Sequence, residues 1–336
     1  MEALLHLQGD ADSALTPLFL IHPISGLALS YMTLGDLSED SERPVYGINS
    51  PTYSKKSYRL PTSLHGLALE YVSIIRRNVQ PVGPYLIGGW SMGGMIAMHM
   101  ANILEAQHQE VIHVVLIDAM NPDATPVFSS AEEHENCTTL TFNRLTQSIK
   151  APARPRIRTF DSTSSTVTVT SLASSTDSQR NFSATDLHNL TKAQNQFGKE
   201  VVVEVREVLD EDYDSDSCSD TYSDDSTTHG LDDTLERMYQ HIFNGLSCAG
   251  KTSTAKLSPI AAPITLIKCA LIDPLPSSLS DARTRAVHKI FKDKRSGWTF
   301  PRLRTVMINS AHDRVFDPEH VAELTNALRG ILDRCC

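Results

Sequence analysis

Short apolar runs and helix-like repeats alternate along the first 120 residues of the chain. The apolar runs have the length and composition of strands buried on both faces, and they occupy residues 17–22, 45–48, 85–89 and 113–118. Residues 64–79 repeat apolar side chains at helical spacing, and residues 92–106 are apolar almost all round, as in a buried helix. Strands that alternate with helices predict an α/β protein with a mostly parallel central sheet and helices on both of its faces.

This pattern stops after residue 118. Residues 161–185 contain fourteen Ser or Thr among twenty-five, and residues 210–233 contain ten acidic residues and no Lys or Arg. Both stretches have too few apolar side chains to offset the entropy of ordering, so we expect them to be exposed loop or disorder outside the core. Residues 186–209 are predicted to be partly helical and residues 231–246 helical, and we expect these helices to cover the site described below.

The strand and helix signals resume near the end of the chain. Residues 263–269 and 303–308 are predicted strands, and residues 318–332 are predicted to form an amphipathic helix. The simplest organisation is a single domain over residues 1–336. Its core would comprise residues 15–120 and 258–336, and residues 121–257 would be a long lid insertion.

Charge and cysteine content narrow the function classes. The net charge of the 336-residue chain is −10, and the acidic stretch 210–233 accounts for it, so nothing suggests a nucleic-acid partner. That stretch could itself be an interaction tail, although a solvated insert is the simpler interpretation. We expect no membrane span, because no apolar run approaches the required length. The six cysteines lack C-x-x-C spacing and no signal sequence is evident, which favours a reducing, cytoplasmic location.

The strongest chemical signal is the sequence GWSMG at residues 89–93, directly between a predicted strand and a predicted helix. G-x-S-x-G in that setting is a nucleophile elbow, in which small residues let strand and helix approach closely around the serine. The helix that follows offers unpaired backbone N–H groups and the positive end of its dipole. Ser91 is therefore the predicted nucleophile.

A nucleophilic serine needs a base and a carboxylate that orients the base. His312 follows the predicted strand 303–308, where a loop reaches the same sheet edge as Ser91. His22 also follows a strand, but the first such loop usually contributes to an oxyanion hole. For the acid, Asp118 and Asp273 each follow a predicted strand, and their positions alone do not decide between them.

These residues resemble a known family, the thioesterase domains that release products from polyketide synthases and nonribosomal peptide synthetases. The matching segments are FLIHPISG at 19–26, YGINSP at 46–51, PYLIGGWSMGG at 84–94, LID at 116–118 and SAH at 310–312. The resemblance covers residues 15–120 and 258–330 well and the middle of the chain poorly. It implies an α/β-hydrolase fold. It also favours Asp118, because in that family the acid follows the serine by 27 residues, as Asp118 follows Ser91.

The resemblance further implies an acyl-serine mechanism on a thioester carried by the phosphopantetheine of an acyl or peptidyl carrier protein. Backbone N–H groups of Met92 and Ile24 would form the oxyanion hole, and no metal or organic cofactor would be needed. The chain contains no ketosynthase, adenylation or carrier segment, so we expect a free-standing thioesterase or one cut from a larger synthase. The alternatives are a small-ester hydrolase of the same fold and a non-catalytic module that binds carrier proteins.

Overall fold

The structure is a computed structural model of the chain. It describes residues 2–38, 42–55, 57–150, 167–169, 203–205, 225–250, 257–272, 275 and 279–335. Contacts within the chain define two compact units. The first unit comprises Met1–Asn143 and Asp233–Cys336, and the second comprises Arg144–Asp232.

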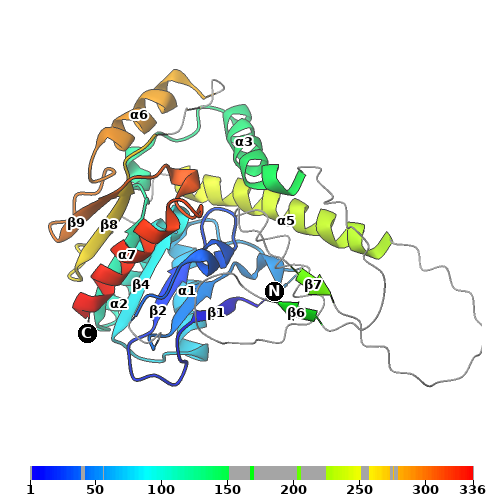
Figure 1. Ribbon diagram of the computed structural model, residues 1–336. Coiled ribbons are helices and arrows are strands. Elements are labelled where there is room, and N and C mark those ends of the chain that lie inside the picture. Colours follow the sequence, from blue (N-terminus) through cyan, green and yellow to red (C-terminus); the bar gives the residue numbers. More distant parts are fainter. Residues whose placement is uncertain are drawn as a thin grey trace, which may run out of the picture. The chain divides into compact units, whose positions relative to one another are not determined.

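A seven-stranded sheet forms the centre of the first unit (Figure 1). From one edge to the other its strands are β1 (Leu4–Gln8), β3 (Val45–Ile48), β2 (Leu18–Ile21), β4 (Tyr85–Trp90), β5 (Val111–Ile117), β8 (Ile264–Cys269) and β9 (Leu303–Ile308). β1 is antiparallel to β3, and all the other neighbours are parallel. The parallel strands therefore present their carboxyl ends at one edge, where loops from distant parts of the sequence meet.

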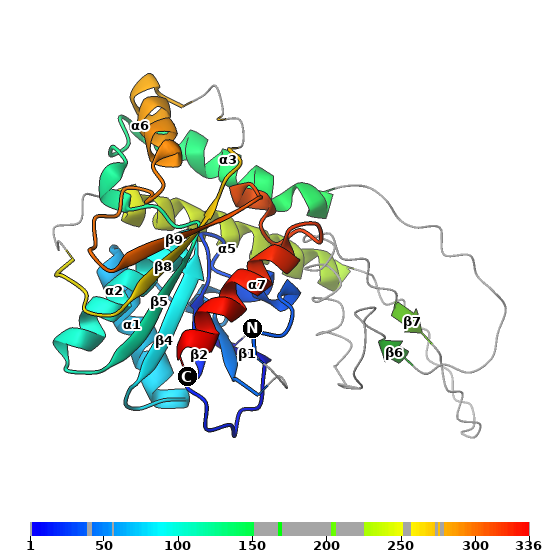
Figure 2. The same ribbon diagram turned by 60° about the vertical axis from the view of Figure 1, so that its left-hand side comes forward.

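Helices cover both faces of this sheet (Figures 1 and 2). α1 (Leu64–Asn78) and α2 (Met92–Ala106) pack on the face that receives Phe19 and Ile21 of β2. α7 (Val321–Leu332) and the short 3₁₀ helix Ala28–Thr33 pack on the other face, which receives Leu18 and Leu20. Because successive side chains of a strand point to opposite faces, a strand covered on both sides must be apolar throughout.

Two further α-helices, α3 (Ala131–Lys150) and α5 (Asp225–Gly250), lie between β5 and β8 in the sequence. A third, α6 (Asp281–Lys292), lies between β8 and β9. The Glu133 carboxylate of α3 accepts a hydrogen bond from the Arg283 guanidinium of α6 at 3.2 Å, which ties these two helices together. The part of α5 that lies in the first unit contacts the loop after β2.

Most elements fall where the apolar pattern predicts them. The predicted bounds of β3, α2 and β9 match the structure, and β2, β4, β5 and β8 differ by one or two residues at their ends. The last helix begins at Val321 rather than 318, because residues 318–320 form a turn. Among the strands and α-helices, β1, β6 (Val167–Val169), α3 and α6 were not predicted.

The region between β5 and β8 requires three corrections. β7 (Val203–Val205) pairs antiparallel with β6 (Val167–Val169) in the second unit. The prediction of helix over 186–209 is therefore wrong at 203–205, and the expectation of loop or disorder over 161–185 is wrong at 167–169. β-branched valines suit a strand better than a helix. α5 begins at Asp225, so residues 225–230 of the acidic stretch, expected to be loop, are helical, and the helix predicted over 231–246 is part of α5. The predictions for the remaining residues of 161–224, namely 161–166, 170–202 and 206–224, fall outside the described residues.

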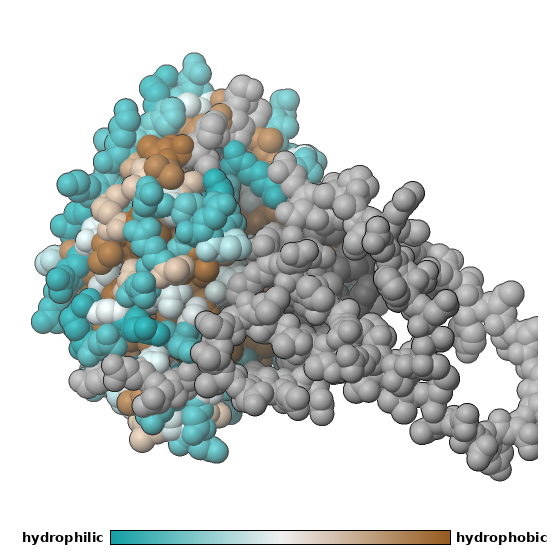
Figure 3. Space-filling view, in the orientation of Figure 1, coloured by the Kyte–Doolittle hydropathy of each residue, from teal (hydrophilic) through white to brown (hydrophobic). Residues whose placement is uncertain are grey.

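The surface of the described residues is mainly polar, as expected when the apolar side chains are buried between the sheet and its helices. The face drawn in Figure 3 is mostly hydrophilic, with apolar side chains in small patches. Within the described ranges, no helix combines the length and the hydropathy that a bilayer crossing requires.

Candidate active site

Ser91 occupies a strained turn between β4 and α2. Its φ is 56° and its ψ is −122°, a combination that costs a non-glycine residue about 1–3 kcal/mol. The turn needs small neighbours, because a Cβ on Gly93 would lie 2.2 Å from the carbonyl oxygen of Ile21. A Cβ on Gly89 would lie 2.5 Å from the carbonyl carbon of Gly93. The G-x-S-x-G spacing therefore produces the close strand–helix approach that lifts Ser91 to the carboxyl edge of the sheet.

His312 faces Ser91 from the loop after β9. Its Nε2 lies 3.1 Å from Oγ of Ser91, and its ring packs 5.4 Å from the indole of Trp90, centroid to centroid. The imidazole side chain is 25% exposed, so a substrate can reach it. β9 and β4 are separated in the sheet by β5 and β8, and the loop after β9 bridges that distance.

Asp118 completes the arrangement from the end of β5. Its Oδ2 accepts a hydrogen bond of 2.7 Å from Nδ1 of His312, and its Oδ1 accepts one of 3.0 Å from the backbone N–H of Cys269. Burial by itself would raise the pKa of Asp118. The hydrogen bond and charge of His312, with the Cys269 N–H, outweigh it and hold that pKa below its usual value. An ionised Asp118 fixes the tautomer of His312 that leaves Nε2 free to accept the serine proton.

The segment after Asp118 is held by a turn between α6 and β9. The indole N–H of Trp298 donates to the carbonyl of Ala119 at 2.9 Å, and the N–H of Asn121 donates to the carbonyl of Ser296 at 2.9 Å. Asn121 also donates through its side chain to the carbonyl of Gly297 at 3.0 Å. Asp118 has a positive φ of 41°, and this anchoring explains how that conformation is maintained.

Met92 and Ile24, the expected oxyanion donors, lie beside each other. In the parallel pair of β2 and β4, Ile21 is opposite Gly89. Ile24 lies three residues after Ile21, and Met92 lies three residues after Gly89. A Cβ on Gly245 of α5 would contact both Cδ1 of Ile24 at 2.7 Å and Sδ of Met92 at 3.1 Å. Neither backbone N–H has a hydrogen-bond partner within the described part of the chain, so both are available to a ligand.

His22, the other histidine that follows a strand, is not placed to act as the base. It is fully buried, and its Nδ1 and Nε2 contact the carbonyl of Pro23 at 2.7 Å and the hydroxyl of Tyr71 at 2.5 Å. Burial, together with the neighbouring His241, lowers its pKa to about 3, so the ring is neutral at physiological pH. The other candidate acid, Asp273, lies outside the described residues.

Sequence reasoning did not identify several residues that support the site. Tyr31 donates its hydroxyl to the carbonyl of Ile21 at 2.6 Å and accepts from the N–H of Trp90 at 2.7 Å, so it joins the ends of β2 and β4. His241 of α5 contacts the carbonyl of Ile24 at 3.0 Å across 217 residues of sequence. No local motif marks either residue, because each acts through a contact with a distant segment.

A serine in a strand–turn–helix elbow, hydrogen-bonded to a histidine on the same sheet edge, defines a serine hydrolase of the α/β-hydrolase class. Comparison with known proteins then identifies the family. The family model of the thioesterase domain matches residues 16–236. The thioesterase pytI of Aspergillus terreus is 37% identical over 99% of this chain and 99% of its own length. The chain therefore belongs to the thioesterase family, which confirms the resemblance drawn from the motifs.

Two further similarities concern part of the sequence and the fold. The non-reducing polyketide synthase PKS12 of Gibberella zeae is 42% identical over 116 residues, which are 34% of this chain and 6% of that synthase. The solved structure of the NocB thioesterase domain, in covalent complex with a fluorophosphonate nocardicin G analogue, superimposes with a TM-score of 0.54. It is 19% identical and covers 98% of this chain and 99% of that one, so it supports the fold.

Proposed function

We propose that this thioesterase releases a polyketide or peptide acyl chain from the phosphopantetheine thioester of an acyl or peptidyl carrier protein in secondary-metabolite biosynthesis. The observation that carries the proposal is the hydrogen-bonded series Ser91–His312–Asp118 in a chain of the thioesterase family. The similarity of part of the chain to a polyketide synthase supports the carrier-bound substrate.

In this mechanism His312 takes the proton of Ser91 as Oγ attacks the thioester carbonyl. Asp118 stays ionised and stabilises the resulting imidazolium. The N–H groups of Met92 and Ile24 stabilise the negative oxygen of the tetrahedral intermediate, and one such donor contributes about 3–4 kcal/mol in related enzymes. The thiol leaves with the proton from His312, and water or another nucleophile then attacks the acyl-serine.

No resident metal or organic cofactor takes part in this proposal, because the side chains above perform each proton transfer. The phosphopantetheine belongs to the carrier and enters as part of the substrate. We propose a cytoplasmic location, since no disulfide joins the cysteines that the structure describes, Cys137, Cys248, Cys269 and Cys335, and disulfides are rare in a reducing compartment.

The test compares a carrier-bound thioester and a simple ester that carry the same acyl group. Carrier protein loaded with an octanoyl-phosphopantetheine arm is incubated with the wild type or with Ser91→Ala, and intact-mass spectrometry measures loss of the octanoyl group. p-Nitrophenyl octanoate is the parallel ester substrate. We expect wild-type enzyme to unload the carrier and Ser91→Ala to leave it loaded. Hydrolysis of the ester alone would indicate a small-ester hydrolase. Binding of the carrier without hydrolysis of either substrate would indicate a non-catalytic module.

A further inference from the structure

The loop that follows β2, residues 23–26, has all four of its carbonyl groups held by hydrogen bonds. The donors are Nδ1 of His22 to Pro23 at 2.7 Å, Nδ1 of His241 to Ile24 at 3.0 Å, the hydroxyl of Tyr53 to Ser25 at 2.5 Å and the N–H of Ser50 to Gly26 at 2.8 Å. Carbonyl oxygens only accept, so each histidine Nδ1 must carry a proton here. Donors from separate elements therefore fix this loop.

These bonds determine the direction of the Ile24 N–H. The carbonyl of Pro23 and the N–H of Ile24 belong to one planar trans peptide and point in opposite directions. The carbonyl of Ile24 belongs to the next peptide. His22 thus holds the peptide plane that contains the N–H of Ile24, and His241 holds the plane on the other side of the Ile24 Cα, so rotation of this N–H is restricted from both sides.

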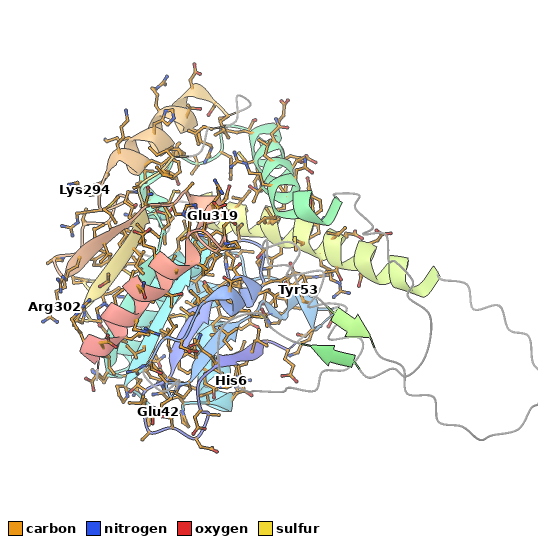
Figure 4. All side chains as sticks on the ribbon, in the orientation of Figure 1. His6, Glu42, Tyr53, Lys294, Arg302 and Glu319 are labelled. Atoms are coloured by element: carbon orange, nitrogen blue, oxygen red, sulfur yellow. The ribbon has the colours of Figure 1, made fainter. Side chains whose placement is uncertain are left out.

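His241 makes this contact from α5, which comes from the region expected to form the lid. Its ring lies edge-to-face on His22 at 5.1 Å between centroids. Its Cδ2 and Nε2 occupy the space that a side chain at Gly26 would need, 2.9 Å from the position of such a Cβ. Tyr53, labelled in Figure 4, stacks on the same ring at 6.3 Å.

The chemistry of His241 indicates a role beyond stability. The side chain is 1% exposed, and burial lowers its pKa to about 4, so it is neutral at physiological pH. With Nδ1–H donated to Ile24, the lone pair of Nε2 is buried without a partner among the described residues. A buried polar atom without a partner destabilises the folded protein. An apolar residue would avoid that cost but would lose the bond to Ile24.

We propose that His241 is a positioning residue that aims the N–H of Ile24 at the oxyanion, so that α5 and the oxyanion hole are assembled together. Gly245, one turn further along α5, supports this role, because its missing side chain lets the helix contact both Ile24 and Met92. The inference rests on the proposed function, since it assigns His241 to the oxyanion hole of that reaction.

The experiment measures the rate at which an alkyl fluorophosphonate inactivates the enzyme. Oγ of Ser91 forms a bond to phosphorus, fluoride leaves, His312 takes the serine proton, and the phosphoryl oxygen occupies the oxyanion hole. The variants are His241→Leu, which removes the donor, and His241→Asn, whose amide N–H can replace Nδ1–H. His241→Gln places its amide near Nε2 instead. His113→Leu is the matched control, because His113 is buried on β5 and its hydrogen bond goes to Thr265.

We expect His241→Leu to react at least tenfold more slowly than the wild type, since a misplacement of about 1 Å can cost about 100-fold. His241→Asn should recover most of that loss, His241→Gln should not, and His113→Leu should react like the wild type. The same order should appear in kcat for thioester hydrolysis, with KM little changed. Equal inactivation rates for wild type and His241→Leu would overturn the positioning role. If His241→Leu does not fold, equal rates for the Asn and Gln variants would overturn it. An unlabelled wild type, or labelling of Ser91→Ala, would instead overturn the proposed function.

Discussion

Oδ1 of Asp118 accepts a 3.0 Å hydrogen bond from the backbone N–H of Cys269, the last residue of β8. The other oxygen of the same carboxylate accepts from His312. The end of β8, from which the alternative acid Asp273 would extend, thus anchors the carboxylate of its neighbour strand β5. Because both oxygens are committed, the orientation of Asp118 is fixed before substrate arrives.

The hydrogen bond from Cys269 predicts how the side chain would be oriented in Asp118→Asn. The N–H of Cys269 requires an acceptor, so it would hold the amide oxygen and turn the amide N–H₂ toward His312. His312 would then carry its proton on Nε2 and could no longer accept from Ser91. We expect kcat to fall by about 10⁴-fold, the loss seen for the same change in a serine protease triad, with stability nearly unchanged.

Asp273→Asn is the matched variant for this prediction, and we expect it to retain the wild-type rate. Steady-state hydrolysis of an acyl thioester measures both variants, and thermal unfolding checks their folding. A large loss in Asp273→Asn with normal activity in Asp118→Asn would show that the acid is misassigned.

The second prediction concerns the elbow glycines. In Gly93→Ala the new methyl group would lie 2.2 Å from the carbonyl oxygen of Ile21 and 2.7 Å from that of His22. Backbone atoms cannot move aside cheaply, so α2 must shift and carry Ser91 with it. We expect a loss of about 1–3 kcal/mol in the free energy of unfolding and a fall of about 100-fold in kcat.

Gly330→Ala is the control for that substitution, because Gly330 lies in α7 with no atom within 4 Å of a new Cβ. It should stabilise the protein by about 0.5–1 kcal/mol, since alanine is the better helix former. Urea unfolding measures both variants. A Gly93→Ala protein as stable and as active as Gly330→Ala would contradict the close strand–helix approach.

The sequence contained enough information for most of the fold and for the serine, base and acid candidates. A strand buried on both faces is apolar along its whole length, so β2, β4 and β5 are visible in the pattern. Ser91 and His312 are visible because an elbow and a loop after a strand are local features. The same reasoning failed for β1, α3 and α6. The edge strand β1 is half-buried throughout, and the two helices are mainly polar.

The sequence pattern did not identify His241 and Tyr31 as residues of the site, because their contacts are distant in the sequence. Their partners, Ile24 and Trp90, lie 217 and 59 residues away in the sequence. A histidine on an amphipathic helix is compatible with solvent, a core or a site, and only the folded chain shows which of these applies. Position after a strand did not decide between Asp118 and Asp273. The family resemblance favoured Asp118, and the structure shows this residue hydrogen-bonded to His312.

The third prediction is a loss of stability in mild acid. Burial lowers the pKa of His22 to about 3 and that of His241 to about 4, whereas both titrate near 6.5 in an unfolded chain. Between these values the unfolded state binds more protons than the folded one. The stabilisation is therefore complete above pH 6.5 and is lost as pH falls toward 4. Each histidine contributes a slope of about 1.4 kcal/mol per pH unit in that window.

Urea unfolding at pH 7.5, 6.0 and 5.0 measures this slope. His241→Asn removes one of the titrating groups and keeps the hydrogen bond to Ile24. Its stability should therefore fall less steeply with pH than that of the wild type, by about 1.4 kcal/mol per unit. Identical slopes for the two proteins would contradict a buried, neutral His241.

The fourth prediction concerns the carboxylate of Glu133, which joins α3 to the start of α6. Oε2 accepts from the N–H and hydroxyl of Ser129, both at 2.7 Å. Oε1 accepts from the N–H and hydroxyl of Ser280 at 3.2 and 2.6 Å and from Nε of Arg283 at 3.2 Å. The Arg283 guanidinium lies 4.0 Å from the centre of the Phe128 ring. The Glu133 and Arg283 side chains are both at most 10% exposed, so this is a buried ion pair.

Glu133→Gln should therefore destabilise the protein by about 3–5 kcal/mol. Its amide nitrogen cannot accept the bonds that one carboxylate oxygen now receives, and Arg283 is left as a buried cation without a negative partner. Asp317→Asn is the matched control, because Asp317 pairs with Arg314, which is 53% exposed, and solvent screens such surface pairs so that they add little stability. Urea unfolding at neutral pH compares the two variants. A Glu133→Gln protein that loses no more stability than Asp317→Asn would show that α3 and α6 are held together by other contacts.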